Sequence, residues 1–285
     1  MSNTLSASLI LDTLSKRTQT TIGQQFAPLG AYASDFSEDV MNQGQSVQVP
    51  LATAGGTAQT NPTNWESGDS TIANVPVTVA DYSVSFHITP LQMNNSYKLA
   101  QLMDINVQNF VNKVQSIALS PFNSTHWTNF IEAAATFSST NLKTIWAGIA
   151  RSPVKNIILD ATYYANFLPA SLTTEIGPKR GLVGFDNFFL NSLWTGAGTN
   201  VTGFAGGPQS VAYVSGLPML DDETKADINA SVIQVDIGGG KILPVQMATW
   251  LSRATRTRWA SLDVMFGASK LDNTKGYLIK SGGGA

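Results

Sequence analysis

The chain has 285 residues, of which only 13% are charged, and its 17 basic and 19 acidic side chains leave a formal net charge of −2. This length is enough to bury a sizeable core, and the apolar fraction of 43% excludes a disordered chain. The absence of Cys excludes disulfide frameworks, thiolate zinc sites and cysteine nucleophiles. Globular proteins carry about a quarter charged residues, and charge is depleted at the cores of protein interfaces. The composition therefore indicates a polar surface, part of which is buried against other subunits.

The N-terminal region shows no sign of membrane insertion or secretion. A short apolar run precedes Lys16 and Arg17, which is the reverse of the order in a secretory signal peptide. No run approaches the eighteen apolar residues of a membrane span. Within residues 1–42 helical spacing is clear only at Leu5, Leu9, Ile10 and Leu14, and a looser stretch follows. We therefore expect residues 1–42 to form an arm rather than part of the core.

Residues 45–51 and 74–79 alternate polar and apolar side chains, and the second stretch runs on into 82–88 with the same alternation. This pattern predicts strands. The intervening residues 52–73 are rich in Gly, Thr, Asn and Ser and read as an irregular tip. Between Arg17 and Lys98 there are six acidic residues and no basic one. Because an isolated hairpin is marginal in water, we expect another surface, or a second copy, to cover it.

The remaining elements follow in the order of a mixed protein. Apolar residues at helical spacing, uninterrupted by Gly or Pro, predict one long helix over 94–119 and a second over 139–149. A buried strand is expected at 156–160, a short helix at 162–168, and a Gly-rich connection at 196–207. The stretches 188–190 and 209–214 flank that connection, and strands are expected at 231–237, 245–251, 257–266 and 277–280. This order predicts an α+β fold rather than a βαβ series.

A search for catalytic motifs assigns no catalytic residue and no cofactor. His87 and His126 lack a two-histidine metal spacing, and no nucleophile elbow occurs. The Gly238–Lys241 run fails as a phosphate loop, because Val235 and Ile242 stand where Gly and Ser or Thr are needed. Asp221, Asp222 and Glu223 form a weak candidate site for a hard cation, with a solvated loop as the alternative.

The densest basic cluster consists of Arg253, Arg256 and Arg258. In a strand, Arg256 and Arg258 lie on the same face. The cluster is interpreted in three ways: contact with a phosphate backbone, pairing with the acidic hairpin of a neighbour, or a solvated face. The net charge of −2 argues against a dedicated nucleic-acid binder.

Several segments, in this order, resemble the major capsid (coat) proteins of tailed bacteriophages, which have the Hong Kong 97-type capsid fold. The opening Gly44-Gln45-Ser46-Val47-Gln48-Val49-Pro50 and the return from Val77-Thr78-Val79 to Phe86-His87-Ile88-Thr89 look like the extended loop of that fold. Helix 94–119 looks like its spine helix. The segments 156–160, 203–205 with 210–214, and 263–268 are similar to parts of its axial domain and returning strands. The likeness covers essentially the whole chain.

The resemblance implies an N-terminal arm at 1–42, an extended hairpin loop at 43–90 and a peripheral domain with the spine helix at 91–154. It further implies an axial domain at 155–243 and returning peripheral strands at 244–285. Such a subunit assembles with itself into hexamers and pentamers of an icosahedral shell around non-specifically bound double-stranded DNA. Its other partners are portal, scaffolding or decoration proteins, and no membrane is involved. The implied location is the virion capsid, assembled in the host cytoplasm.

Contacts between subunits are expected at the hairpin tip, at Trp65, Glu66 and Asp69. Only some 42 residues precede the loop strand, whereas some relatives fuse a scaffolding segment before the arm, so scaffolding is expected to be a separate protein, absent or already cleaved away. The loop also lacks the Lys that some relatives cross-link to a neighbouring Asn. The alternatives are an encapsulin-like nanocompartment shell, another virion structural protein, or an α+β hydrolase or binding module using Asp221, Asp222 and Glu223.

Overall fold

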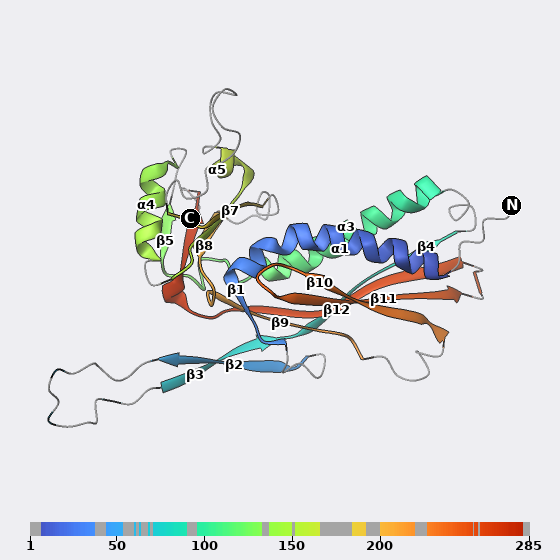
Figure 1. The fold of residues 1–285 in the computed structure, drawn as a ribbon, viewed down its shortest axis with the longest axis horizontal. Coiled ribbons are helices and arrows are strands. Elements are labelled where there is room, and N and C mark those ends of the chain that lie inside the picture. The colour runs from blue at the N-terminus through green and yellow to red at the C-terminus, as the bar shows by residue number, and fades with distance from the viewer. Residues whose placement is uncertain are drawn as a thin grey trace.

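The architecture is that of a computed structural model, which describes residues 7–37, 44–53, 60, 63, 68, 71–89, 96–132, 137–149, 152–165, 184–191, 200–219, 227–252, 254–255 and 257–281. Two long helices cover one face of a six-stranded sheet, a smaller five-stranded unit lies at one end, and a hairpin projects from the opposite face (Figure 1). The α+β fold class is confirmed.

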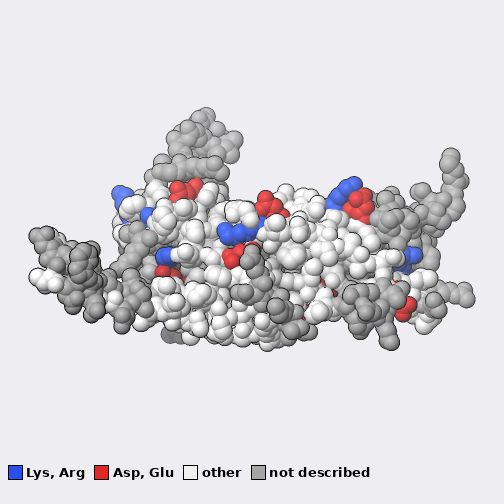
Figure 2. Space-filling model, turned by 60° about the horizontal axis from the view of Figure 1, so that its bottom comes forward, with Lys and Arg blue, Asp and Glu red and all other residues white. Residues whose placement is uncertain are grey.

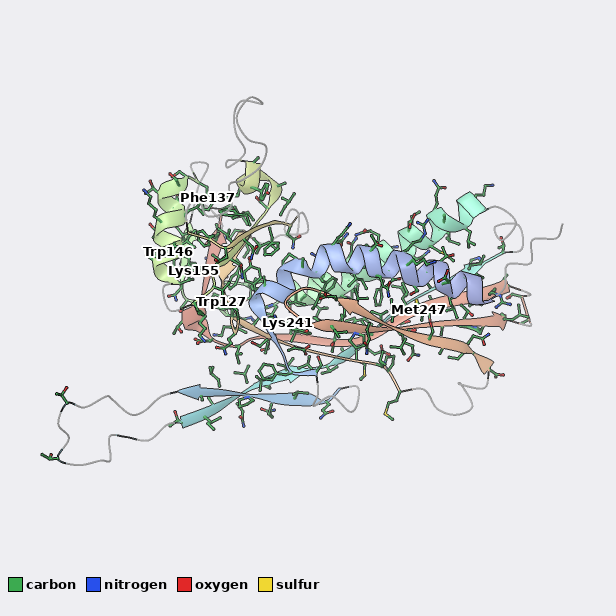
Figure 3. The ribbon with its side chains drawn as sticks, viewed as in Figure 1. Trp127, Phe137, Trp146, Lys155, Lys241 and Met247 are labelled. Atoms are coloured by element: carbon green, nitrogen blue, oxygen red, sulfur yellow. The ribbon has the colours of Figure 1, made fainter. Side chains whose placement is uncertain are left out.

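The larger sheet contains the longest strands. Its strand order is β1-β9-β12-β11-β10, and β4 pairs antiparallel with β12. The bounds are β1 Ala33–Asp35, β4 Ala80–Ile88, β9 Val211–Gly216, β10 Asn229–Asp236, β11 Ile242–Ser252 and β12 Thr257–Lys270. Alternate residues of β12, namely Ala260, Leu262, Val264 and Phe266, are fully buried beneath the helices. Met247 of β11 belongs to the same core (Figure 3).

Helix α3 (Ser96–Leu119) confirms the predicted long helix. Its apolar residues recur every three or four positions, so they form one stripe that faces the sheet. That stripe consists of Leu99, Met103, Val107, Phe110, Val111, Val114 and Ala118, all buried. The outer face is mostly polar but includes Ile105, which is 61% exposed. Helix α4 (Ser139–Gly148) likewise confirms the second predicted helix.

Helix α1 (Ala7–Tyr32) lies beside α3 and corrects the expectation that residues 1–42 stay outside the core. Ile10, Leu14 and Phe26 are at most 1% exposed within the main core. The helix continues through Gly23 and Pro28, both of which interrupt the sequence pattern. Packing against α3 and β10 offsets their low helix propensity, which sequence periodicity alone does not register.

The smaller unit has its own core. Its sheet has the order β5-β13-β8-β6-β7 and packs against α4 and the short helix α5 (Ala161–Ala165). The bounds are β5 Phe130–Glu132, β6 Asn156–Leu159, β7 Asn187–Leu190, β8 Val201–Gly206 and β13 Gly276–Lys280, with the 3-10 turn η2 at Asn273–Lys275. Lys155 Nζ lies 4.7 Å from the Trp146 ring centroid, and Phe137 packs here, while Trp127 belongs to the main core (Figure 3).

The expected Gly-rich connection at 196–207 is wrong for its second half, which forms the fully buried strand β8. A Cβ on Gly203 would lie 2.7 Å from the Ile158 carbonyl oxygen, so glycine is needed for the close approach of the strands. The predicted strands at 156–160, 231–237, 245–251, 257–266 and 277–280 are all present, and the stretches 188–190 and 209–214 also form strands.

The expected division of the chain differs from the sheet membership. Residues 155–243 are split, because β6, β7 and β8 belong to the smaller sheet whereas β9 and β10 belong to the larger. Strand β13, expected to return to the peripheral domain, pairs with β8 and β5 in the smaller sheet. Strand pairing links segments far apart in sequence, so boundaries drawn as continuous ranges cannot follow it.

The predicted hairpin is confirmed as the antiparallel pair β2 (Ser46–Thr53) and β3 (Thr71–Thr78). Its base is held by the subunit itself, since Val47, Val49, Val77 and Val79 pack on Val214 and Met265, among others. Each strand contains a Pro, Pro50 or Pro76, which lacks an N–H group. Neither strand therefore offers an unbroken row of donors to a further strand.

Candidate functional site

Most of the residues singled out in the sequence lie outside the described part of the chain. These are Trp65, Glu66, Asp69, Asp221, Asp222, Glu223, Arg253 and Arg256. Their predicted roles remain predictions. Within the described residues no group of three His, Cys, Asp or Glu side chains gathers where it could hold a metal ion. None of the described helices is long and apolar enough to cross a membrane.

Arg258 is the member of the basic cluster that the structure describes. It lies in β12, between Ile88 of β4 and Leu251 of β11. By strand alternation its side chain is on the same face as Ala260, which is the face covered by the helices. It is half-buried, and its Nε is buried without a hydrogen-bond partner among the described residues. Arg258 is thus placed near the helix layer rather than on the open face.

The hairpin is the first candidate assembly surface. Beyond its anchored base, the side chains of β3 are mostly exposed, and Ile72 is 68% exposed. Figure 2, in which this side of the molecule comes forward, shows few charged side chains among the described residues, in small separate groups between uncharged ones. A two-stranded projection with exposed apolar residues gains stability when a second surface covers it.

The second candidate surface is a groove of 530 Å³ on the sheet face that the helices leave uncovered. The polar side chains that line it are Asp81, Ser83, Ser85, Gln246, Ser261 and Asp263. Apolar lining comes from Ala248 and Trp250 and, at the rim, from Pro218, Met219 and Ile228. In β4 and β12 the groove residues alternate with core residues, because successive side chains of a strand point to opposite faces of the sheet.

Two carboxylates dominate the charge of this groove. Asp81 is opposite Met265 and Asp263 is opposite Ser83, so the two carboxylates are diagonal neighbours on one face. Ser261 Oγ donates to Asp263 Oδ2 at 2.7 Å, whereas Asp81 Oδ1 is buried without a hydrogen-bond partner among the described residues. Burial, followed by repulsion from Asp263, raises the pKa of Asp81. The ionised site is therefore short of positive charge.

An aromatic row crosses three strands beside the groove. The Trp250 and Trp259 rings stack with centroids 6.1 Å apart and planes 8° apart, and His87 lies 5.4 Å from Trp259. His87 thus has a structural neighbour and stands outside any described metal-binding group. His126 contacts Asn123 and the Pro121 carbonyl oxygen in a turn.

Two polar contacts fix the start of the larger sheet. The Tyr213 hydroxyl donates to Asp35 Oδ2 at 2.7 Å, and burial is the main cause that raises the pKa of Tyr213. Lys241 Nζ donates to the Gly30 carbonyl oxygen at 2.5 Å, and desolvation lowers the pKa of Lys241. The Gly238–Lys241 turn therefore secures the end of α1, a structural role in place of phosphate binding.

Sequence analysis missed the groove. Its signal was present, because polar residues occupy alternate positions in 81–87 and at Ser261 and Asp263. Only the pairing of β4 with β12 and of β12 with β11 brings these positions onto one surface.

Comparisons with known proteins address the fold. No protein-family model and no curated protein matches the sequence. The virus-like particle from Pyrococcus furiosus matches with a TM-score of 0.58 at 10% identity, over 95% of this chain and 98% of that chain. A structure from Mycobacterium phage Ogopogo matches with a TM-score of 0.54 at 13% identity, over 91% and 92%. The capsid of an empty GTA particle matches with a TM-score of 0.53 at 9% identity, over 92% and 97%. The chain therefore has the Hong Kong 97-type capsid fold that the sequence resemblance implied.

Proposed function

We propose that this protein is the major capsid protein of a tailed phage, which self-assembles into hexamers and pentamers of an icosahedral shell around double-stranded DNA. The observation that carries the proposal is the fold, shared with capsid structures over nine-tenths of the chain. The projecting hairpin and the open sheet face support it, because both are surfaces that a neighbouring subunit would cover. The role is structural and non-enzymatic.

Within such a shell, the hairpin tip with Trp65, Glu66 and Asp69 contacts an adjacent subunit. The basic cluster of Arg253, Arg256 and Arg258 faces either packaged DNA or a neighbouring subunit. Portal, scaffolding or decoration proteins complete the particle, which is assembled in the host cytoplasm. Residues 1–42 and 43–90 act as the N-terminal arm and the extended loop, with α1 seated on the subunit's own core.

The test is expression of the chain alone and together with its neighbouring genes, followed by sizing and negative-stain imaging. We expect closed shells or hexameric sheets, and nuclease-protected DNA in particles from infected cells. A persistent monomer, even beside a scaffolding candidate, would contradict a shell function. Enclosed protein cargo without DNA would instead indicate a nanocompartment.

Trp65→Ala tests the hairpin contact. An aromatic side chain near a polar tip contributes most when an interface buries it, and such residues contribute about 2 kcal/mol or more. We expect reduced shell yield with an unchanged unfolding midpoint of the subunit, measured by sizing and by circular dichroism. Trp146→Phe, on α4 of the smaller unit, serves as the matched control. Unchanged yield and particle stability for Trp65→Ala would argue against the contact.

A further inference from the structure

The open-face groove has more hydrogen-bond acceptors than donors. The described residues that line it include two carboxylates and no Lys or Arg. Neither Asp81 nor Asp263 forms a salt bridge with a described residue. Gln246, only 6% exposed, also lines the groove. The buried Asp81 Oδ1 has no hydrogen-bond partner among the described residues, which indicates that a ligand supplies the missing donor.

The ligand that fits this chemistry is a guanidinium group. It carries a positive charge and several N–H donors in one plane, so it can meet both a carboxylate and an amide oxygen. The indole of Trp250 lines the same groove and provides a flat face for stacking. A metal ion fits less well, because the described residues offer no cluster of three ligating side chains.

We propose that the groove docks an arginine-bearing segment of a second copy of this chain, namely the turn that carries Arg253 and Arg256 between β11 and β12. This inference rests on the proposed function, since it requires copies to lie side by side. It adds a specific ionic contact between subunits, separate from the hairpin tip.

The positions of the basic residues along the chain indicate which segment supplies the arginine. The hairpin cannot supply the cation, because residues 18–97 contain no Lys or Arg. Several other cations already have partners in their own subunit: Arg17 pairs with Asp104, Lys16 with Asp12 and Lys275 with Asp272. The turn between β11 and β12 carries two arginines within four residues, which matches the two carboxylates of the groove.

The first experiment uses unassembled subunits and a small probe. N-acetyl-arginine amide is titrated while tryptophan fluorescence is followed, with N-acetyl-glycine amide as the control probe. We expect a saturable change that is absent in Trp250→Phe and at least tenfold weaker in Asp81→Asn/Asp263→Asn. An identical response to both probes would overturn guanidinium recognition. Because this readout needs no assembly, it stays informative even if the chain forms no shell.

The second experiment exchanges the charges in the full chain. Asp81→Arg/Asp263→Arg alone and Arg253→Asp/Arg256→Asp alone should each lower shell yield at least tenfold, and the four substitutions together should restore it. Ser83→Ala, in the same groove but uncharged, should assemble normally. If shell yield is lost and the four substitutions together do not restore it, the turn does not occupy the groove. The same conclusion follows if Lys179→Asp/Arg180→Asp restores the yield of Asp81→Arg/Asp263→Arg instead. Intact shells in every single-sided variant would overturn the docking itself.

Discussion

The two faces of the six-stranded sheet differ although they are made by the same strands. In β12, Leu262 and Val264 are fully buried under α1 and α3, while Ser261 and Asp263 between them line an open groove. The covered face supplies the apolar burial that folds the subunit. The open face keeps the two carboxylates of the groove, and the buried Asp81 Oδ1 has no hydrogen-bond partner among the described residues, an arrangement that makes sense if another molecule completes it. We therefore propose that folding and assembly use opposite sides of one sheet.

The largest expected effect is on the covered face. Leu262→Ala removes a fully buried side chain between the sheet and the helices, and should destabilise the subunit by about 2–5 kcal/mol. Urea unfolding followed by circular dichroism measures it. The neighbouring Ser261→Ala loses only the hydrogen bond to Asp263, about 1 kcal/mol. Equal losses in the two variants would contradict the contrast between the faces.

A second prediction concerns the seating of α1 on the sheet. A Cβ on Gly30 would collide with the Ile237 carbonyl oxygen, a backbone atom that cannot move aside cheaply. Gly30→Ala should therefore destabilise the subunit by about 1–3 kcal/mol through overpacking. Gly23→Ala is the matched control, because its Cβ would lie at an ordinary 3.5 Å from the Asp236 carbonyl oxygen. Thermal unfolding of both variants measures this difference. A loss of stability in Gly30→Ala that is absent in Gly23→Ala is expected if α1 packs this closely on the sheet.

On the open face, removing a charge should stabilise the subunit. Burial and the neighbouring Asp263 raise the pKa of Asp81, so ionised Asp81 opposes folding. Asp81→Asn should raise Tm by less than Leu262→Ala lowers it. The same substitution should weaken shell assembly. The stabilisation by Asp81→Asn is complete at pH values above the raised pKa of folded Asp81. It shrinks as the pH falls through that pKa, and it disappears below pH 3.8, the pKa of the free carboxyl group. A stabilisation by Asp81→Asn that grows as the pH falls would contradict the upward shift of the Asp81 pKa.

The smallest expected effect is on the solvent side of α1. Lys16 and Asp12 form an exposed pair at 3.0 Å, one helical turn apart. Such pairs contribute about 0.3–0.5 kcal/mol and are screened by salt. Lys16→Gln should therefore shift the unfolding midpoint within this range at low salt and leave it unchanged in 1 M salt. A larger, salt-independent shift would mean that this helix surface has further contacts.

Local periodicity predicted the elements whose pattern is unbroken. Helix α3 has an uninterrupted apolar stripe, and the strands of the last third alternate clearly, so their positions follow from the residues themselves. Prediction failed where packing overrides local preference. Gly23 and Pro28 hid the continuation of α1, and the glycines of β8 imitated a loop although they permit close strand approach.

The sequence by itself determined the element types, the hairpin, the uneven distribution of charge and the absence of recognisable catalytic motifs, because each is a property of neighbouring residues. Only the tertiary structure decided that α1 completes the core, which sheet each strand joins and which sheet face stays open. Those features depend on pairing across long separations, such as Asp81 beside Asp263. Register between such distant segments is set by the whole fold and has no local signature.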